Sequence, residues 1–225
     1  FGTDLCIHEI ARRLAGRYEV KVFACVDDGT YRDPAYEIIP YRTPHVRQNL
    51  ADERAVLRNA EDLRPYGLDV LIPATYPFFG VPSRLGIPGI MYDMGVVPSR
   101  GLPSSIRFTV EYMRLTNRYW QYRSAAVVTL SEFLRSTFPW WSQQKTRVIY
   151  IGADHLRTDD AFPPRDAIRR RYGAGPDDVL FAFIGRLDLG TPYKGVAELV
   201  ESFQRVRLNN DRVRMVMCGF GSGSD

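Results

Sequence analysis

The stretch VLFAFIGRLDLGTPYKGVAEL, from Val179 to Leu199, decides the fold that we predict for this chain. It opens with an uninterrupted apolar run, Val179–Ile184, which is typical of a parallel strand buried on both faces. Gly185 and Arg186 end that run, and a loop with a further glycine and a proline leads to a helix that begins near Lys194. The stretch is therefore predicted to form a strand, a loop and a helix in succession.

Two cations flank this loop. Arg186 stands at the carboxyl end of the strand, and Lys194 stands at the start of the helix, where backbone N–H groups without an intrahelical partner point outward. Gly185 allows close approach to the backbone, and Gly195 follows the lysine. Solvated basic residues are common at both kinds of position, so either cation alone says little. Their joint placement in one unit indicates a site for a polyphosphate.

The composition is that of an ordinary globular protein. The chain has 225 residues, of which 45% are hydrophobic and 25% are charged. A net charge of +4 favours an anionic partner. The sequence has no zinc-finger spacing, no helix-turn-helix pattern and no aromatic-rich RNA-binding segment, so we expect no nucleic acid among its partners.

The cysteines and the termini indicate where the protein acts. Cys6, Cys25 and Cys218 are widely spaced and form no CxxC motif, which predicts neither a disulfide framework nor a zinc site. The sequence has neither an apolar run long enough to span a membrane nor a signal peptide, so we expect a cytoplasmic protein. Because the chain opens at Phe1 rather than at a methionine, we expect that its true start lies upstream.

Strand and helix patterns alternate along the whole chain. This alternation is typical of βαβ units around a parallel sheet and predicts an α/β protein. Ligands of such folds gather beyond the carboxyl ends of strands, which draws attention to Thr75, Tyr76 and Asp93. The predicted strands are 19–26, 68–74, 87–92, 125–130, 147–151, 179–184 and 213–218, and the predicted helices are 4–15, 46–63, 104–123, 131–138 (capped by Ser131), 165–172 and 194–208.

The helix predicted over 104–123 interleaves aromatic and basic residues. The apolar residues Phe108, Met113, Leu115, Tyr119, Trp120 and Tyr122 are interleaved with the basic residues Arg107, Arg114, Arg118 and Arg123. The interpretation that we favour is an apolar stripe that faces the core, with the arginines in solvent. The alternative is a helix that lies on an anionic membrane, at the inner face of which the protein would be peripheral.

Several short motifs, in the same order, resemble one known family. They are the G-R and K-G pairs of 185–195, RVIYIGAD (Arg147–Asp154), VVTLSEFLRSTF (Val127–Phe138) and the opening FGTDLCIHEIARRLAGRYEVKVFA (Phe1–Ala24). Together they look like the retaining glycosyltransferases of family 4, also called glycosyl transferases group 1. The resemblance implies a GT-B fold, with two Rossmann-like domains that each contain a parallel sheet. An N-terminal acceptor-side domain would span residues 1–154, without its first strand, and residues 155–225 would be the start of an incomplete C-terminal domain that binds the nucleotide-sugar.

The resemblance also assigns roles to single residues. It places Gly185, Arg186 and Lys194 at the donor diphosphate, Gly2 as the remnant of a glycine-rich loop, and Gly219 at the turn after the last strand. A histidine, often in a His-Asp pair, follows the third strand in the family, whereas this chain has Tyr92 and Asp93.

Asp93 keeps the second half of that pair. We expect it to contact the acceptor hydroxyl, in which case it would be the catalytic residue of this domain. The alternative is a loop carboxylate that caps backbone N–H groups.

The implied activity is transfer of a sugar from a UDP-, GDP- or ADP-sugar to a hydroxyl acceptor, which would be a glycan, a lipid-linked acceptor or a small molecule. We expect neither a cofactor nor a metal ion, since the sequence has no D-x-D motif and two cations would offset the charge of the diphosphate. The family's E-x7-E segment is absent, so we expect a fragment with little activity. Two alternatives stay open: a nucleotide-sugar epimerase of GT-B type and a non-catalytic nucleotide-binding scaffold.

Overall fold

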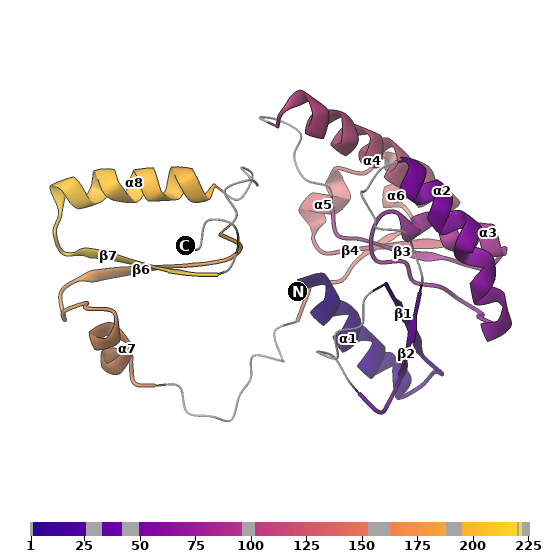
Figure 1. The fold of residues 1–225 in the computed structure, drawn as a ribbon, viewed down its shortest axis with the longest axis horizontal. Coiled ribbons are helices and arrows are strands. Elements are labelled where there is room, and N and C mark those ends of the chain that lie inside the picture. Colours follow the sequence, from indigo (N-terminus) through magenta and orange to yellow (C-terminus); the bar gives the residue numbers. More distant parts are fainter. Residues whose placement is uncertain are drawn as a thin grey trace. The chain divides into compact units, whose positions relative to one another are not determined.

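The computed structural model describes residues 2–25, 33–41, 50–95, 102–152, 163–187, 195–219 and 221. These residues form two compact units (Figure 1). Unit 1 lies within Phe1–Val96 and Ser104–Gly152, and unit 2 lies mainly within Ala153–Asp225. Both contain parallel strands connected by helices, as predicted for an α/β chain. The functional roles predicted for two domains stay a prediction.

Unit 1 opens with a helix and a small parallel sheet. Helix α1 (Gly2–Ala15) begins two residues before the prediction and ends before Gly16, as expected. Strand β1 (Lys21–Ala24) falls within the predicted strand and pairs in parallel with β2 (Glu37–Pro40). The prediction missed β2, because a strand of four residues shows too little alternation to be recognised.

The middle of unit 1 is mainly helical. Helix α2 (Leu50–Asn59) continues into the 3-10 helix η1 (Ala60–Tyr66), and the second 3-10 helix η2 (Phe78–Gly80) leads into the short helix α3 (Val81–Leu85). Where the prediction had one helix over 46–63, residues 46–49 lie outside the described residues. The strand predicted at 68–74 is wrong, because this segment makes only an isolated bridge between Leu71 and Gly89.

Prolines explain why that segment is not a regular strand. The Ile90 N–H donates to the Leu71 carbonyl at 3.0 Å, and the Tyr92 N–H donates to the Pro73 carbonyl at 3.0 Å. Pro73 accepts a hydrogen bond through its carbonyl but has no N–H to donate one in return, so regular strand pairing stops there. In the same way Pro88 delays the next strand, and β3 runs over Ile90–Asp93 rather than from residue 87.

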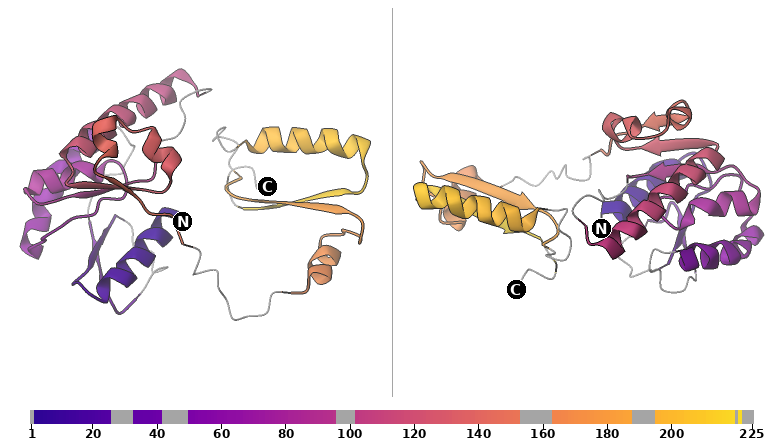
Figure 2. Two further views of the ribbon diagram at one scale, coloured as in Figure 1. Left: turned by 180° about the vertical axis from the view of Figure 1, so that it is seen from behind. Right: turned by 90° about the horizontal axis from the view of Figure 1, so that it is seen from above.

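The rest of unit 1 surrounds a three-stranded parallel sheet in the order β3-β4-β5. Helix α4 has the predicted bounds and lies along one face of this sheet (Figures 1 and 2). Strands β4 and β5 are shorter than predicted, and the end of the segment predicted for β5 is exposed. The elements are α4 (Ser104–Arg123), β4 (Ala126–Thr129), α5 (Glu132–Ser136), α6 (Trp140–Gln143) and β5 (Thr146–Val148).

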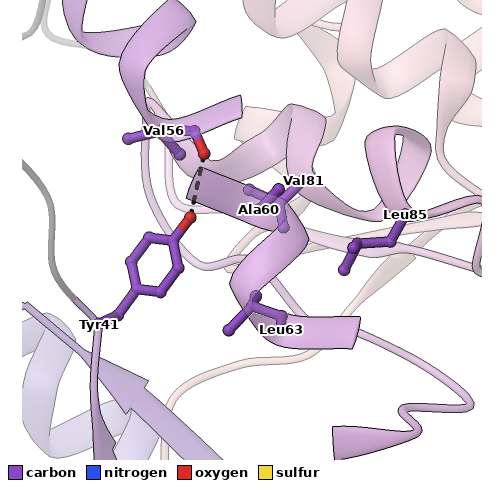
Figure 3. Close-up of a cluster of buried hydrophobic side chains, with 6 residues drawn as sticks. All are labelled: Tyr41, Val56, Ala60, Leu63, Val81 and Leu85. Atoms are coloured by element: carbon purple, nitrogen blue, oxygen red, sulfur yellow. Dashed lines mark hydrogen bonds between the residues drawn. The ribbon is translucent and has the colours of Figure 1, made fainter. Parts of the chain in front are cut away.

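Two buried clusters hold unit 1 together. One joins α2, η1 and α3 through Val56, Leu63 and Leu85, among others (Figure 3). The hydroxyl of Tyr41 donates to the Val56 carbonyl at 3.0 Å within this cluster, so the segment that follows β2 is fixed to α2. The other cluster packs Met91 of β3 against Val127 of β4, with α4 covering both. Because β3 and β4 pair in parallel, their carboxyl ends lie at the same edge of the sheet.

Unit 2 consists of α7 (Arg165–Arg171), β6 (Val179–Ile184), α8 (Val196–Asn209) and β7 (Val213–Cys218). Strands β6 and β7 have the predicted bounds and pair in parallel along their whole length. Helix α8 lies along one face of the pair (Figures 1 and 2). The burial predicted for β6 is wrong: Val179, Phe181 and Ile184 are exposed. Burial on both faces needs layers on both sides and neighbours on both edges, and β6 pairs with β7 alone among the described strands.

Candidate functional site

The carboxyl ends of β6 and β7 meet at a pair of glycines. Because Ile184 pairs with Cys218, Gly185 and Gly219 leave the two strands side by side. The Gly185 N–H donates to the Cys218 carbonyl at 3.0 Å. A Cβ added at Gly219 would lie 1.7 Å from the Gly185 carbonyl oxygen, so no larger residue fits there without a backbone shift. The structure thus brings together two of the predicted site residues.

A cation and a helix start lie at the same end of unit 2. Arg186 follows Gly185 directly and is exposed. Since β6, α8 and β7 form one βαβ unit, α8 begins at the edge where the strands end (Figure 1). Gly195 precedes the helix with φ of 66°, a left-handed conformation that favours glycine. Lys194 lies outside the described residues.

The start of α8 has no side-chain cap among the described residues. The first-turn N–H groups of a helix have no intrahelical partner and can donate to an anion. Glu198 lies in that first turn and adds a negative charge. An anionic ligand at this edge would therefore depend on the cations of the loop, Arg186 and Lys194, for its charge complementarity.

The corresponding edge of unit 1 is closed by its own side chains. The Asp93 side chain lies at the end of β3, and the residue is only 2% exposed. One carboxylate oxygen accepts the Gly95 N–H at 2.8 Å, and the other accepts Nε2 of Gln121 at 2.9 Å. The Asp93 carbonyl accepts the Thr129 hydroxyl at 2.8 Å. Both carboxylate oxygens are therefore occupied within the protein.

This geometry identifies the part that Asp93 plays in the fold. Burial is the main cause that raises the pKa of its carboxyl, and the hydrogen bonds from Gln121 and Gly95 oppose that rise. The carboxylate caps a backbone N–H, which is the alternative that the sequence left open. The geometry does not favour the proposed contact with an acceptor, since the carboxylate has almost no exposed surface. That contact stays a prediction.

The structure also shows the surroundings of three other residues of unit 1 that the sequence analysis named: Tyr92, Gly2 and Ser131. Tyr92, at the position of the family's histidine, is buried, and burial is the main cause that raises the pKa of its phenol. Gly2 is the first residue of α1. The adjacent Thr3 hydroxyl approaches the sulfur of Met94 at 3.8 Å, so the start of α1 adjoins the segment after β3. Ser131 caps α5 as predicted, with its hydroxyl oxygen accepting the Leu134 N–H at 3.1 Å.

Sequence reasoning missed two buried polar groups in unit 1. Gln121 holds Asp93 across 28 residues of chain, and such a pairing leaves no local pattern. Glu53 is buried between α2 and α4, where it accepts the Tyr112 hydroxyl at 3.0 Å and the Trp120 indole N–H at 2.5 Å. One signal in the sequence could have indicated that Gln121 is buried. Asn117 and Gln121 follow Val110 and Met113 at helical spacing, so all four lie on the same face of α4, and this face is turned toward the core.

Metal-binding and membrane-spanning features can be assessed only for the described part of the chain. Within it, no group of three or more His, Cys, Asp or Glu side chains is arranged to hold a metal ion. No described helix is both long and apolar enough to cross a bilayer. The absence of a metal requirement stays a prediction.

Comparisons with known proteins establish the fold. No protein-family model and no curated protein sequence matches the chain. Several solved structures do match. Sucrose-phosphate synthase from Thermosynechococcus elongatus aligns with a TM-score of 0.66 at 14% identity, over 97% of this chain and 65% of that one.

Two further structures agree. HepE from Anabaena, solved in complex with UDP-glucose, aligns with a TM-score of 0.59 at 16% identity, over 96% of this chain and 65% of that one. A glycosyltransferase from Rickettsia africae aligns with a TM-score of 0.59 at 12% identity, over 98% of this chain and 65% of that one. The chain thus spans about 65% of the length of these structures.

These structures are glycosyltransferases of the GT-B type, and the chain has the GT-B fold predicted from its sequence. Identities this low establish the architecture alone. Membership of family 4 and the retaining mechanism therefore stay predictions.

Proposed function

We propose that the protein is a retaining glycosyltransferase of family 4 that transfers a sugar from a nucleotide-diphosphate sugar to a hydroxyl acceptor. The observation that carries this proposal is the edge of unit 2, where Gly219 approaches Gly185 closely and the exposed Arg186 follows. The GT-B fold and the UDP-glucose bound to the structurally similar HepE support it. UDP-glucose is accordingly the first donor to test, ahead of GDP- and ADP-sugars.

The chemistry follows from the charge on the leaving group. During transfer, the bond from the anomeric carbon to the diphosphate breaks with its electron pair, and a bond to the acceptor oxygen forms as the hydroxyl proton leaves. Negative charge grows on the diphosphate, so a fixed cation stabilises the transition state more than the ground state. Arg186 supplies this cation, and Lys194 is its proposed partner.

The size of this effect follows from Coulomb's law. At about 4 Å and an effective dielectric constant near 20, one charge pair contributes roughly 4 kcal/mol before desolvation. A part of that energy is enough for a rate effect of about a hundred- to a thousandfold. No metal ion is needed in this scheme, and a strict requirement for Mg²⁺ or Mn²⁺ would contradict it.

The acceptor is proposed on less direct grounds. The hydroxyl of a glycan, of a lipid-linked sugar or of a small molecule would suit the same donor site. Unit 1 is the acceptor-side domain in this proposal, and a contact of Asp93 with the acceptor hydroxyl stays a prediction. Product analysis with and without an added acceptor distinguishes transfer from epimerisation, which needs no acceptor, and from binding without turnover.

The decisive experiment is calorimetric titration of the chain with UDP, GDP, ADP and their glucose conjugates. We expect selective binding of one nucleotide, weakened at least tenfold by Arg186→Ala and by Lys194→Ala. Arg170→Ala is the matched control, since Arg170 is an exposed arginine of α7 in the same unit. Equal binding by all four proteins would contradict the proposed site.

A further inference from the structure

Helix α4 presents an apolar ridge to solvent. Phe108, Leu115, Tyr119 and Tyr122 are 76%, 63%, 55% and 67% exposed. Their spacing of seven, four and three residues places all of them on one face of the helix. We call these four residues the exposed ridge. Its exposure corrects the favoured interpretation of the sequence, which assigned these four side chains to the core together with Met113 and Trp120; only Met113 and Trp120 pack against the core.

The ridge is held in this orientation by the opposite face of the same helix. Val110, Asn117 and Gln121 are buried, and Met113 packs against the cluster around Met91. Gln121 also donates to Asp93 at 2.9 Å. Turning the ridge inward would bring these side chains into solvent. The helix therefore has two apolar faces, of which one is used by the fold.

Basic side chains border the ridge on both sides. A helix advances about 100° per residue, which places Arg107 and Arg118 along one flank and Arg123 along the other. Within the described part of the chain, none of these arginines makes an ion pair. The single acidic residue of α4 is Glu111, which Arg114 already binds at 2.8 Å. The surface around the ridge is thus positively charged.

An apolar groove continues the ridge toward α2. It has a volume of about 390 Å³, and Leu57 and Trp120 line it together with Leu115 and Tyr119 of the ridge. Arg54, which is exposed, stands at its border. Glu53 also lines the groove, but its carboxylate is buried and held by Tyr112 and Trp120. The groove therefore enlarges the apolar surface and keeps its positive border.

We propose that the exposed ridge and this groove dock the protein on an anionic lipid bilayer. Tyrosine and phenylalanine side chains enter the interface between headgroups and acyl chains, and arginines beside them contact lipid phosphates. A second copy of the chain suits the surface less well, because a symmetric contact would bring the arginine flanks of the two copies together. The docking does not depend on the proposed sugar transfer.

Vesicle co-sedimentation tests this proposal. We expect the chain to bind phosphatidylcholine vesicles that contain phosphatidylglycerol, and to bind pure phosphatidylcholine vesicles at least tenfold more weakly. Each arginine near an anionic surface contributes about fivefold to the partition coefficient. Both Phe108→Ser/Tyr119→Ser and Arg107→Glu/Arg118→Glu should therefore lower binding at least tenfold, with circular dichroism unchanged.

Matched variants away from the ridge serve as controls. Leu208→Ser removes an apolar side chain that is 86% exposed on α8, and Arg17→Glu/Arg170→Glu makes the same change of charge on other exposed arginines. Both controls should bind within twofold of the unchanged chain. Absence of binding, equal binding to both kinds of vesicle, or unchanged binding by the ridge variants would overturn the proposal. A dimer in sedimentation equilibrium that Phe108→Ser dissociates, without vesicle binding, would assign the ridge to a second copy.

Discussion

The two units end their parallel strands in opposite ways. At the end of β3 in unit 1, Asp93 is buried and both of its carboxylate oxygens accept hydrogen bonds from the protein. At the ends of β6 and β7 in unit 2, two glycines approach each other and an exposed arginine follows. The first edge is occupied by its own polar groups, whereas the second leaves backbone and charge accessible.

This difference shows how a fold separates structural from ligand-binding positions. Ligands of open α/β sheets gather beyond the carboxyl ends of strands, but position alone does not make a site. A polar side chain at such an end binds a ligand only when its hydrogen-bonding capacity is not already used within the protein. By this criterion Arg186 is a candidate ligand contact, whereas each carboxylate oxygen of Asp93 already accepts a hydrogen bond from the protein.

The largest effect that we expect comes from Asp93→Ala. This change leaves Nε2 of the buried Gln121 without its acceptor, and a buried group left unpaired costs about 1 to 3 kcal/mol. It also removes the acceptor of the Gly95 N–H, which belongs to an exposed residue and adds less to the loss. We therefore expect the free energy of unfolding of unit 1 to fall by roughly 3 kcal/mol, measured by urea denaturation. The control is Asp69→Ala, which removes an exposed carboxylate and should be neutral. A loss as small as that of the control would mean that the edge of unit 1 is not closed in this way.

The next effect is that of Gly219→Ala in unit 2. The added Cβ would lie 1.7 Å from the Gly185 carbonyl oxygen, so the two backbones must separate. We expect unit 2 to lose about 2 kcal/mol, as in other overpacked sites, and nucleotide binding to weaken with it. Hydrogen exchange of the β6 and β7 amides measures the loss locally.

The matched control for that change is Gly175→Ala in the same unit. A Cβ at Gly175 would lie 3.7 Å from a carboxylate oxygen of Asp178, an ordinary contact. This variant should leave exchange and nucleotide binding nearly unchanged. If both glycine variants behave alike, the close approach at the edge of unit 2 has no special part in its stability.

A smaller effect should appear in the pH dependence of stability. Because burial raises the pKa of Asp93 above its usual value of 3.8, the folded chain binds this proton more tightly than the unfolded chain does. The proton therefore stabilises the fold fully below the unfolded pKa, and that stabilisation is lost as the pH rises through the folded pKa. Asp93→Asn should remove this dependence.

The structure suggests that the asparagine can be accommodated. Oε1 of Gln121 is buried without a partner, so rotation of this amide would let Oε1 accept from the side-chain N–H of the new asparagine, whose own side-chain oxygen keeps the Gly95 N–H. The measurement is the difference in unfolding free energy between the two proteins from pH 4 to pH 7. A constant difference across this range would show that Asp93 does not titrate there.

Part of this contrast was predictable from sequence. The bounds of α4, β6 and β7 agree with the prediction, because each is a periodic or apolar run whose interior has no glycine or proline. The glycines at 185 and 219 were recognised because glycine at a strand end is a local signal. The start of β3 and the absence of a regular strand near Leu71 depend on Pro73 and Pro88, which have no backbone N–H to donate to a sheet. The apolar pattern from which strands are predicted does not show this effect.

Other parts were not predictable for a physical reason. Helical spacing gives the direction of each side chain of α4, but it does not say which of two apolar faces the sheet will cover. The exposed ridge was therefore assigned to the core. The pairing of Gln121 with Asp93, and of Glu53 with Trp120, joins residues far apart in the chain, so only the folded structure reveals that these carboxylates are already occupied.

The smallest effect on stability should come from Arg186→Ala, and it completes the contrast with Asp93. Arg186 is exposed, and within the described residues it makes no ion pair, so its removal should change the free energy of unfolding by less than about 0.5 kcal/mol. Nucleotide binding should nevertheless fall at least tenfold. Urea denaturation and calorimetry on the same preparation measure both quantities. A variant that loses stability and keeps its affinity would reverse the roles of the two edges, because Arg186 would then be the structural residue.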